Sequence, residues 1–199
     1  MPIRFTEKRM SKTEIKITGF GGQGVILCGY LIGKAASIYD NKHATLTQSF
    51  GPEARGSACS AQVVVSDSRV LYPYVTHPSI MLAMSHDGYA THKDSLAEGA
   101  ILLYDEDLVK PGEHKPGVKA YAIPATRFAE ELGRKIVSNI VMLGFFSAVT
   151  ELLDREAVRK AVETSVPKGT EELNLKAFDK GYQYGLELKS EKAEAVTKA

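Results

Sequence analysis

Polar and apolar residues alternate over residues 14–18, a pattern typical of a half-buried β-strand. Glycines follow at once, and an apolar stretch over residues 25–36 then predicts a helix that is buried around much of its circumference. Residues 43–48 predict a second strand, which returns parallel to the first after a right-handed crossover, and residues 58–65 predict a third. The chain is therefore expected to begin as strand, tight turn, helix and strand.

The rest of the chain continues in strands and then in helices. Three further strands are predicted over residues 79–84, 100–104 and 118–123. Ser85, His86 and Asp87 follow the first of them and can cap a helix that continues to about Ala97. After Pro124 the spacing of apolar residues becomes helical. Four helices are predicted there, over residues 126–132, 139–153, 154–166 and 173–188.

Two details of the helical part can be checked directly. Ser138 or Asn139 is the expected N-cap of the helix over residues 139–153. The last helix is expected to bury one stripe of side chains. That stripe consists of Leu175, Phe178, Tyr182 and Leu186.

These elements predict an α/β fold, a Rossmann-like open sheet that is mostly parallel and has helices on both faces. A turn at residues 66–68 starts a return segment toward Leu71 and Tyr74, which can add a β-hairpin insertion. We expect a single domain over residues 13–189. A flexible N-terminal extension, residues 1–12, precedes it, and a disordered tail, residues 190–199, follows because that tail has little to bury.

The composition narrows the function. With 25 Lys and Arg against 24 Asp and Glu, the formal net charge is +1, and no basic excess points to nucleic acid or an anionic membrane as a partner. The N-terminus lacks the apolar core of a signal peptide. The longest apolar stretch, residues 136–149, is shorter than the roughly 20 residues that span a bilayer. We therefore expect a cytoplasmic protein.

Neither a metal site nor a catalytic residue is predicted. Cys28 and Cys59 lie too far apart for a C-x-x-C pair and are too few to hold an iron–sulfur cluster. The five histidines show no metal-ligand spacing, and no serine stands in a G-x-S-x-G motif. Tyr72 and Tyr74 flank a proline; such aromatics can anchor an interface, although core packing is their commoner role.

The first candidate site is a glycine turn. Gly19, Gly21 and Gly24 satisfy G-x-G-x-x-G between a predicted strand and a predicted helix, with Gly22 and Gln23 between them. Glycines permit a tight turn there, and the N–H groups at the start of the helix can hold an anion.

A dinucleotide would also need an acidic residue about 20 residues later, at the end of the second strand. That strand ends in Gln48, Ser49 and Phe50, and Asp40 precedes it. This disfavours a dinucleotide, and the turn has three other interpretations: anion docking, close packing of helix on strand, and contact with another protein. The Gln23 amide suits a ligand and a neighbouring backbone equally well.

The second candidate site is the loop after the second strand. It contains Gly51, Pro52, Glu53, Arg55 and Gly56. In open α/β sheets, ligands bind at the edge formed by the carboxyl ends of the strands, where this loop is expected. The segment is therefore predicted to be an active-site or interface loop. The alternative is an ordinary surface loop whose charges are solvated.

Four motifs in this order resemble one family, the gamma subunits, or fused gamma domains, of 2-oxoacid:ferredoxin oxidoreductases. The motifs cover residues 19–25, 49–56, 138–144 and 174–182. Together they span about residues 14–185, nearly all of the predicted domain. In one departure, Ser57 stands where many members have a second glycine after the Arg-Gly pair.

The resemblance implies an enzyme of several subunits. Such an enzyme decarboxylates a 2-oxoacid on thiamine diphosphate and Mg, passes electrons through iron–sulfur clusters to ferredoxin, and transfers the acyl group to coenzyme A. This chain would be the gamma subunit, inactive alone and without a cofactor of its own. Its partners would be alpha and beta subunits, and in some members a ferredoxin-like delta subunit.

The resemblance also gives both candidate sites a role. The glycine turn would dock an anion or coenzyme A, and the loop over residues 51–56 would support assembly and the coenzyme A side of the active site. Residues 47–55 and 71–74 are more similar to the 2-oxoglutarate branch than to the pyruvate branch. The residues alone leave two other functions open: a free-standing NAD(P)-dependent oxidoreductase, and a non-catalytic nucleotide-binding or structural Rossmann-like module.

Overall fold

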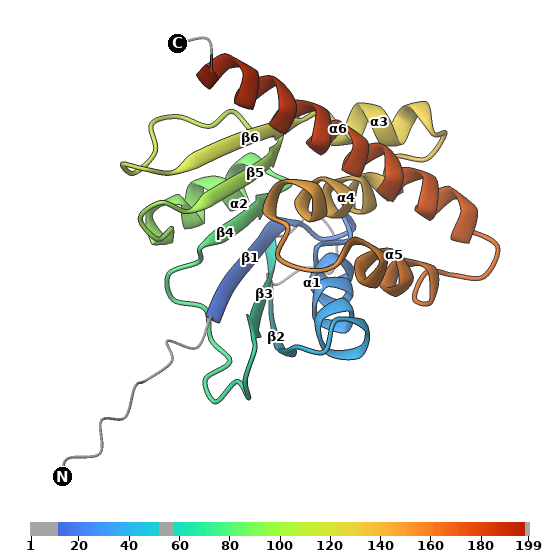
Figure 1. The fold of residues 1–199 in the computed structure, drawn as a ribbon, viewed down its shortest axis with the longest axis horizontal. Coiled ribbons are helices and arrows are strands. Elements are labelled where there is room, and N and C mark those ends of the chain that lie inside the picture. Colours follow the sequence, from blue (N-terminus) through green and yellow to red (C-terminus); the bar gives the residue numbers. More distant parts are fainter. Residues whose placement is uncertain (1–11, 52–57, 198–199) are drawn as a thin grey trace.

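A six-stranded sheet forms the centre of the molecule (Figure 1). The computed structural model describes residues 12–51 and 58–197. The strands are β1 (Lys12–Phe20), β2 (His43–Phe50), β3 (Ala58–Ser66), β4 (Ile80–Ala83), β5 (Ile101–Asp105) and β6 (Lys119–Ile123), in the spatial order β2-β3-β1-β4-β5-β6. The neighbouring pairs β1–β4, β4–β5 and β5–β6 are parallel. Strand β3 runs antiparallel to both β1 and β2. The predicted open, mostly parallel sheet is confirmed.

Helices cover both faces of the sheet, as predicted (Figure 1). The helices are α1 (Val25–Lys34), α2 (His86–His92), α3 (Ala125–Glu131), α4 (Ser138–Thr150), α5 (Arg155–Glu163) and α6 (Glu171–Thr197). The larger part of the core lies between the sheet and α1, α4, α5 and α6, and a smaller cluster around Met81 and Tyr89 lies under α2. Strands β4 and β5 are short and are covered on both faces of the sheet, which explains why their sequences are continuous apolar runs.

Helices α4 and α6 cross in direct backbone contact. A side chain on Gly144 would overlap the Phe178 carbonyl oxygen, and one on Gly181 would overlap the Val141 carbonyl oxygen. Every residue of α4 from Ser138 to Val149 is buried, so this helix lies between the sheet and α6. Glycine is required at the crossing because only its lack of a side chain lets two helices approach this closely.

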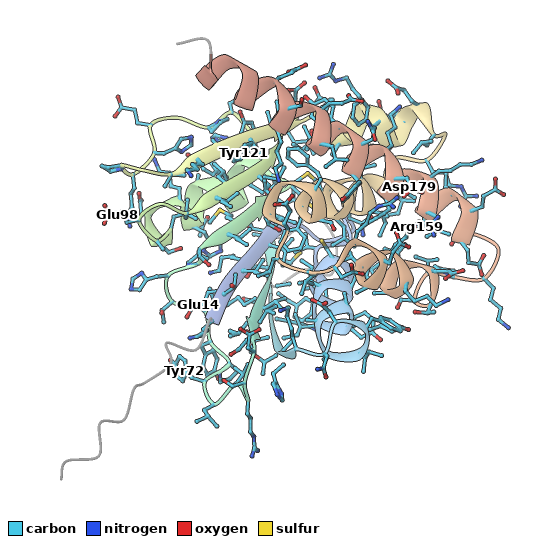
Figure 2. The ribbon with its side chains drawn as sticks, in the orientation of Figure 1. Glu14, Tyr72, Glu98, Tyr121, Arg159 and Asp179 are labelled. Carbon is cyan, nitrogen blue, oxygen red and sulfur yellow. The ribbon has the colours of Figure 1, made fainter. Side chains whose placement is uncertain are left out.

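Helix α5 is tied to α6 by charge as well as by packing (Figure 2). Asp179 on α6 accepts a hydrogen bond from Arg155 at 2.9 Å and lies 3.4 Å from the Arg159 Nε atom. On its inner side α5 buries Val158 and Val162, as the helical spacing predicted.

The antiparallel hairpin is formed by β2 and β3, and not by β3 and the segment that follows it as the sequence predicted. Residues 66–74 form no second strand; instead β3 pairs along its whole length with β2. Ser66 and Ser68 close a local turn, and the Val75 N–H donates to the Gln62 Oε1 atom at 3.1 Å, so this segment folds back over the sheet without joining it.

Three helix details also differ from the sequence prediction. Helix α4 begins at Ser138 without a side-chain cap, because the Asn139 amide hydrogen-bonds elsewhere. On α6 Phe178 is buried, but Leu186 is 38% exposed, because Ala177 and Gly181 form the buried stripe in its place. Helix α6 also continues to Thr197, beyond the predicted end, through Glu, Lys and Ala residues of high helix propensity.

Candidate functional site

The glycine turn connects β1 to α1 and has a left-handed backbone at two positions. Gly22 has a φ of 97° and Gly24, the residue that precedes α1, has a φ of 73°. L-residues with side chains rarely adopt these angles, so glycine is needed at both. The strand-turn-helix order predicted from the sequence is confirmed.

Gln23 closes the crevice between β1 and β4. Its Oε1 atom accepts a hydrogen bond from the Phe20 N–H at 2.6 Å, and its Nε2 atom donates to the Met84 carbonyl at 2.8 Å. The chain leaves β1 through α1 on one face and leaves β4 through α2 on the other. Open α/β sheets bind ligands at such a switch point. Here the Gln23 amide occupies it, so both of its polar ends are used by backbone.

Other residues of the turn serve close packing. A side chain on Gly19 would lie 2.6 Å from the Gln23 Oε1 atom, and one on Gly24 would overlap the Asn139 amide. Asn139 in turn donates to the Gly24 carbonyl at 3.3 Å, which fastens the start of α4 to the start of α1. Gly22 differs, because no atom of the described residues lies within 4 Å of the place where its side chain would be.

Gly22 faces a cavity of about 830 Å³. The start of α1, the end of β2, the segment before α4 and the start of α6 form its walls. Its described lining residues are Gly21, Gly22, Gly24, Val25, Ile26, Leu27, Phe50, Gly51, Cys59, Arg134, Ile136, Val137, Asn139, Val166, Pro167, Thr170, Leu173 and Asn174. The volume lies within the range of about 300–1,000 Å³ that is usual for small-molecule sites.

The cavity is mostly apolar and carries few polar groups. Arg134 is the one charged residue among its described lining residues, and its side chain has no hydrogen bond or ion pair within the described part of the chain. Because the first N–H groups of a helix lack partners within the helix, the start of α1 is a second electropositive feature of the wall. Both features suit an anionic ligand group.

Two buried amides supply acceptors to the same cavity. Asn139 is 3% exposed and uses its Nδ2 atom on the Gly24 carbonyl. Asn174 is 7% exposed and uses its Nδ2 atom on the Thr170 carbonyl at 2.8 Å. In both residues the Oδ1 atom has no hydrogen-bond partner among the described residues. The wall therefore offers acceptors for N–H or O–H groups of a ligand.

The predicted site residues fall into three groups. Gly21, Gly22, Gly24 and Gly51 line the cavity, whereas Gly19 and Gln23 hold the turn from behind. Pro52, Glu53, Arg55 and Gly56 lie outside the described residues.

Sequence reasoning missed three residues of the cavity wall. Arg134 stands alone in an unremarkable stretch, and Asn139 was interpreted as a helix cap. Asn174 lies within a family motif, but no local pattern indicates that its side chain faces a cavity.

The two cysteines differ in their surroundings. Both are free thiols. Cys28 is fully buried on α1, and burial raises its pKa to about 12. Cys59 is 9% exposed on the cavity wall, and burial raises its pKa as well. Among the described residues, neither thiol has a charged partner that would activate it.

The other residues considered from the sequence lie away from this cavity. Ser85 caps α2 by accepting a hydrogen bond from the Gly88 N–H at 3.1 Å, as predicted, and His86 is not part of the cavity wall. Tyr72 and Tyr74 are 56% and 57% exposed, so core packing is excluded for both. Tyr72 lies near the amino end of β1 (Figure 2), where the Lys12 Nζ atom is 6.0 Å from the centroid of its ring.

No metal site or membrane span is found where the structure is described. In residues 12–51 and 58–197, no three His, Cys, Asp or Glu side chains are grouped so that they could hold a metal ion. Over the same residues, no helix combines the length and the apolar character needed to cross a bilayer.

The fold and the site define a class: a Rossmann-like domain whose glycine turn is retained, whose switch-point crevice is closed, and whose cavity opens between α1, α4 and α6. Residues 14–184 match the family model described as pyruvate ferredoxin/flavodoxin oxidoreductase. The chain belongs to this family.

Relatives and solved structures agree with that assignment. The chain is 49% identical over 179 residues to the 2-oxoglutarate synthase subunit KorC of Methanocaldococcus jannaschii, across 89% of this chain and 96% of the relative. It also matches the gamma subunit of a keto/oxoacid ferredoxin oxidoreductase from Geobacter sulfurreducens, with a TM-score of 0.79 and 38% identity over 88% of this chain and 97% of that one.

A third match places the same fold inside a longer chain. The 2-oxoglutarate:ferredoxin oxidoreductase of Magnetococcus marinus, solved with 2-oxoglutarate, coenzyme A and succinyl-CoA, has a TM-score of 0.78 and 25% identity. The match covers 87% of this chain but 31% of that one. This chain is therefore a gamma-type subunit, the counterpart of one domain in that larger polypeptide, and it works within a complex.

Proposed function

We propose that this chain is the gamma subunit of a 2-oxoglutarate:ferredoxin oxidoreductase and that its cavity forms part of the coenzyme A side of the active site. The enzyme would convert 2-oxoglutarate and coenzyme A to succinyl-CoA and CO₂ while it reduces ferredoxin. The 49% identity to a 2-oxoglutarate synthase subunit supports this substrate over pyruvate. We propose a cytoplasmic location for the complex.

The chemistry of the cavity carries the proposal. Coenzyme A joins anionic phosphates to an apolar arm that contains two amides and ends in a thiol. Arg134 and the start of α1 suit the phosphates, the Oδ1 atoms of Asn139 and Asn174 suit amide N–H groups, and the apolar wall suits the arm. A dinucleotide is less well matched, because no Asp or Glu is among the described lining residues.

The two cysteines of this chain do not suit the iron–sulfur clusters that such an enzyme uses. An iron–sulfur cluster needs several thiolates, but Cys28 and Cys59 are separate and both have a raised pKa. We therefore assign thiamine diphosphate, Mg and the clusters to alpha, beta and, where present, delta subunits. Ferredoxin would be reached through the complex. The role left to this chain is to bind and orient coenzyme A.

The loop after β2 belongs to the same proposal. Phe50 and Gly51, the last described residues before it, line the cavity. We propose that Glu53 and Arg55 contact coenzyme A or the neighbouring subunit. Replacing Arg55 by Ala should then weaken assembly or turnover of coenzyme A. Unchanged complex formation and kinetics in the R55A variant would exclude this role.

The direct test is calorimetric titration of coenzyme A into the full chain and into the assembled complex. Arg134→Ala should weaken binding by roughly 10- to 100-fold, because a charge-assisted hydrogen bond contributes about 1.5–3 kcal/mol. Lys135→Ala is the matched control, since Lys135 is the next residue and equally cationic but does not line the cavity. Equal affinities for the two variants, or tighter binding of NAD(P)H than of coenzyme A, would contradict the proposal.

The substrate is tested separately in the assembled enzyme. Ferredoxin reduction that depends on coenzyme A should proceed faster with 2-oxoglutarate than with pyruvate at equal concentration. A faster rate with pyruvate would overturn the choice of substrate and leave the role of the cavity unchanged.

A further inference from the structure

Among the described strands, β2 forms one edge of the sheet, and its own sequence carries none of the residues that usually protect an edge. β2 stands at the end of the strand order, and its eight residues, HATLTQSF, include no Lys, Arg, Asp, Glu, Pro or Gly. Natural proteins usually place charges, prolines or bulges on an edge strand, because unpaired N–H and C=O groups otherwise pair with another chain. An open edge of this length is a surface that accepts a further strand.

The hydrogen-bond pattern shows which residues face outward. Gly51 donates its N–H to the Ala58 carbonyl at 3.0 Å, and these two residues are opposite each other in the β2–β3 register. Hydrogen-bonded pairs alternate along an antiparallel ladder, so the odd-numbered residues of β2 bond to β3. The outward residues are therefore Ala44, Leu46, Gln48 and Phe50. None of the four takes part in a backbone hydrogen bond outside the sheet within the described residues.

Two hydroxyls on the same strand lack partners. Thr45 Oγ1 and Thr47 Oγ1 are buried and make no hydrogen bond within residues 12–51 and 58–197. Leu46 packs against α1 near Gly29, so the two threonines lie on the opposite face of the sheet. A buried polar atom without a partner costs about 1–3 kcal/mol. This cost is removed if a neighbouring strand supplies a hydroxyl.

We propose that β2 pairs antiparallel with β2 of a second copy of this chain, about a two-fold axis at Leu46. In this register Leu46 bonds to Leu46 of the other copy, and Ala44 bonds to Gln48, so only outward-facing backbone groups are used. Thr45 then stands opposite Thr47 in a non-hydrogen-bonded pair, where side chains approach most closely. The strand is thus complementary to itself, and both unpartnered hydroxyls gain a partner by rotation about χ1.

Helix α1 packs against this edge strand and carries an exposed aromatic residue. Gly29 faces β3 and β2, and the next residue, Tyr30, is rotated about 100° around the helix, away from the buried Cys28. Tyr30 is 47% exposed. In the paired arrangement the α1 helices of the two copies flank the axis, because α1 packs against β2 at Leu46.

The test compares two substitutions at Gln48 by sedimentation of the full chain. Gln48→Pro removes an outward N–H without removing a bond to β3, whereas Gln48→Ala keeps that N–H. The wild type and Q48A are expected to sediment as dimers, and Q48P is expected to raise the dissociation constant of the dimer by roughly 100-fold. Circular dichroism should show that Q48P remains folded.

A crosslinking experiment checks the register. The double variant T45C/T47C should form a covalent dimer on mild oxidation, because the two positions face each other across the axis at a distance that suits a disulfide. The single variant T45C should not form this dimer, because position 45 of one copy faces position 47 of the other copy and not position 45.

Two outcomes would overturn the proposal. In the first, the wild type is monomeric and Q48P fails to assemble with the other subunits although Q48A assembles; the edge then receives a strand of a different subunit. In the second, Q48P and Q48A sediment and assemble alike; the edge is then no interface. Neither outcome bears on coenzyme A binding by Arg134.

Discussion

Glycine serves opposite purposes in two regions of this molecule. At the α4–α6 crossing, Gly144 and Gly181 lie against the backbone of the other helix, so no space remains where a side chain would be. At the turn before α1, Gly22 faces the cavity, and no atom in the described part of the chain lies within 4 Å of that place. The crossing is sealed and the turn is open. Glycine in the sequence therefore marks a close approach in one region and a ligand-accessible surface in the other.

The largest expected effect is at the crossing. Gly144→Ala and Gly181→Ala should each lower the free energy of unfolding by about 3 kcal/mol, because the added methyl group forces two helix backbones apart. Urea unfolding measures the change. Gly33→Ala on α1 is the control: its added methyl group meets nothing within 4 Å, so stability should rise by up to about 1 kcal/mol. Equal stability of G144A and wild type would mean that the crossing is looser than described.

The turn should be less sensitive to the same change, and unequally so. Gly24→Ala should cost about 2 kcal/mol, because alanine is strained at its positive φ and its methyl group would displace Asn139. Gly22→Ala should cost about 1 kcal/mol, since only the backbone strain applies. Urea unfolding and coenzyme A titration together distinguish them. If G22A lost as much stability as G24A, the space beside Gly22 would not be open.

Gln23→Ala tests whether the back of the turn is held by side-chain hydrogen bonds. The variant loses the bonds to Phe20 and Met84 and should lose about 1 kcal/mol of stability. Coenzyme A affinity should fall less than in R134A, because Gln23 does not line the cavity. A larger fall in affinity than in R134A would show that the Gln23 amide contacts the ligand itself.

The reaction rates of the two thiols distinguish the open cavity from the closely packed core. Iodoacetamide should label Cys59 in the native chain while Cys28 stays unlabelled, because one lines the cavity and the other lies in the core. Burial raises the pKa of both thiols, so the thiolate is scarce at neutral pH and labelling of Cys59 should accelerate with rising pH. Peptide mass spectrometry identifies the site, and coenzyme A should slow the reaction. Faster labelling of Cys28 would mean that the core opens more readily than the cavity.

Much of the fold follows from local patterns in the sequence. All six strands were predicted within a few residues, because their apolar runs are short and bounded by turn residues. The position of the hairpin was not predictable, since nothing local to β3 determines whether it pairs with the segment before it or after it. The stripe of α6 was partly misplaced because apolar periodicity favours Leu186, whereas tertiary packing selects the small residues Ala177 and Gly181.

The sequence predicted where the candidate site lies, but it did not predict which side chains meet there. The glycine turn and the end of β2 do meet at one cavity, as expected at the carboxyl edge of the sheet. The sequence could not show that Gln23 bonds to Met84, nor that Asn139 and Asn174 lie on one wall, because these residues are far apart along the chain. Side chains that meet only through tertiary structure leave no periodic signal.

The backbone contact between α4 and α6 also constrains motion. Asn139 and Asn174 lie upstream of the crossing glycines on these same two helices, so the contact fixes how far apart the two amides can move. A ligand that enters the cavity cannot widen it by spreading these helices. Any adjustment to the ligand must come from the Arg134 segment, the turn or the end of β2, and slow amide hydrogen exchange in α4 next to faster exchange at the turn would be the signature of this division.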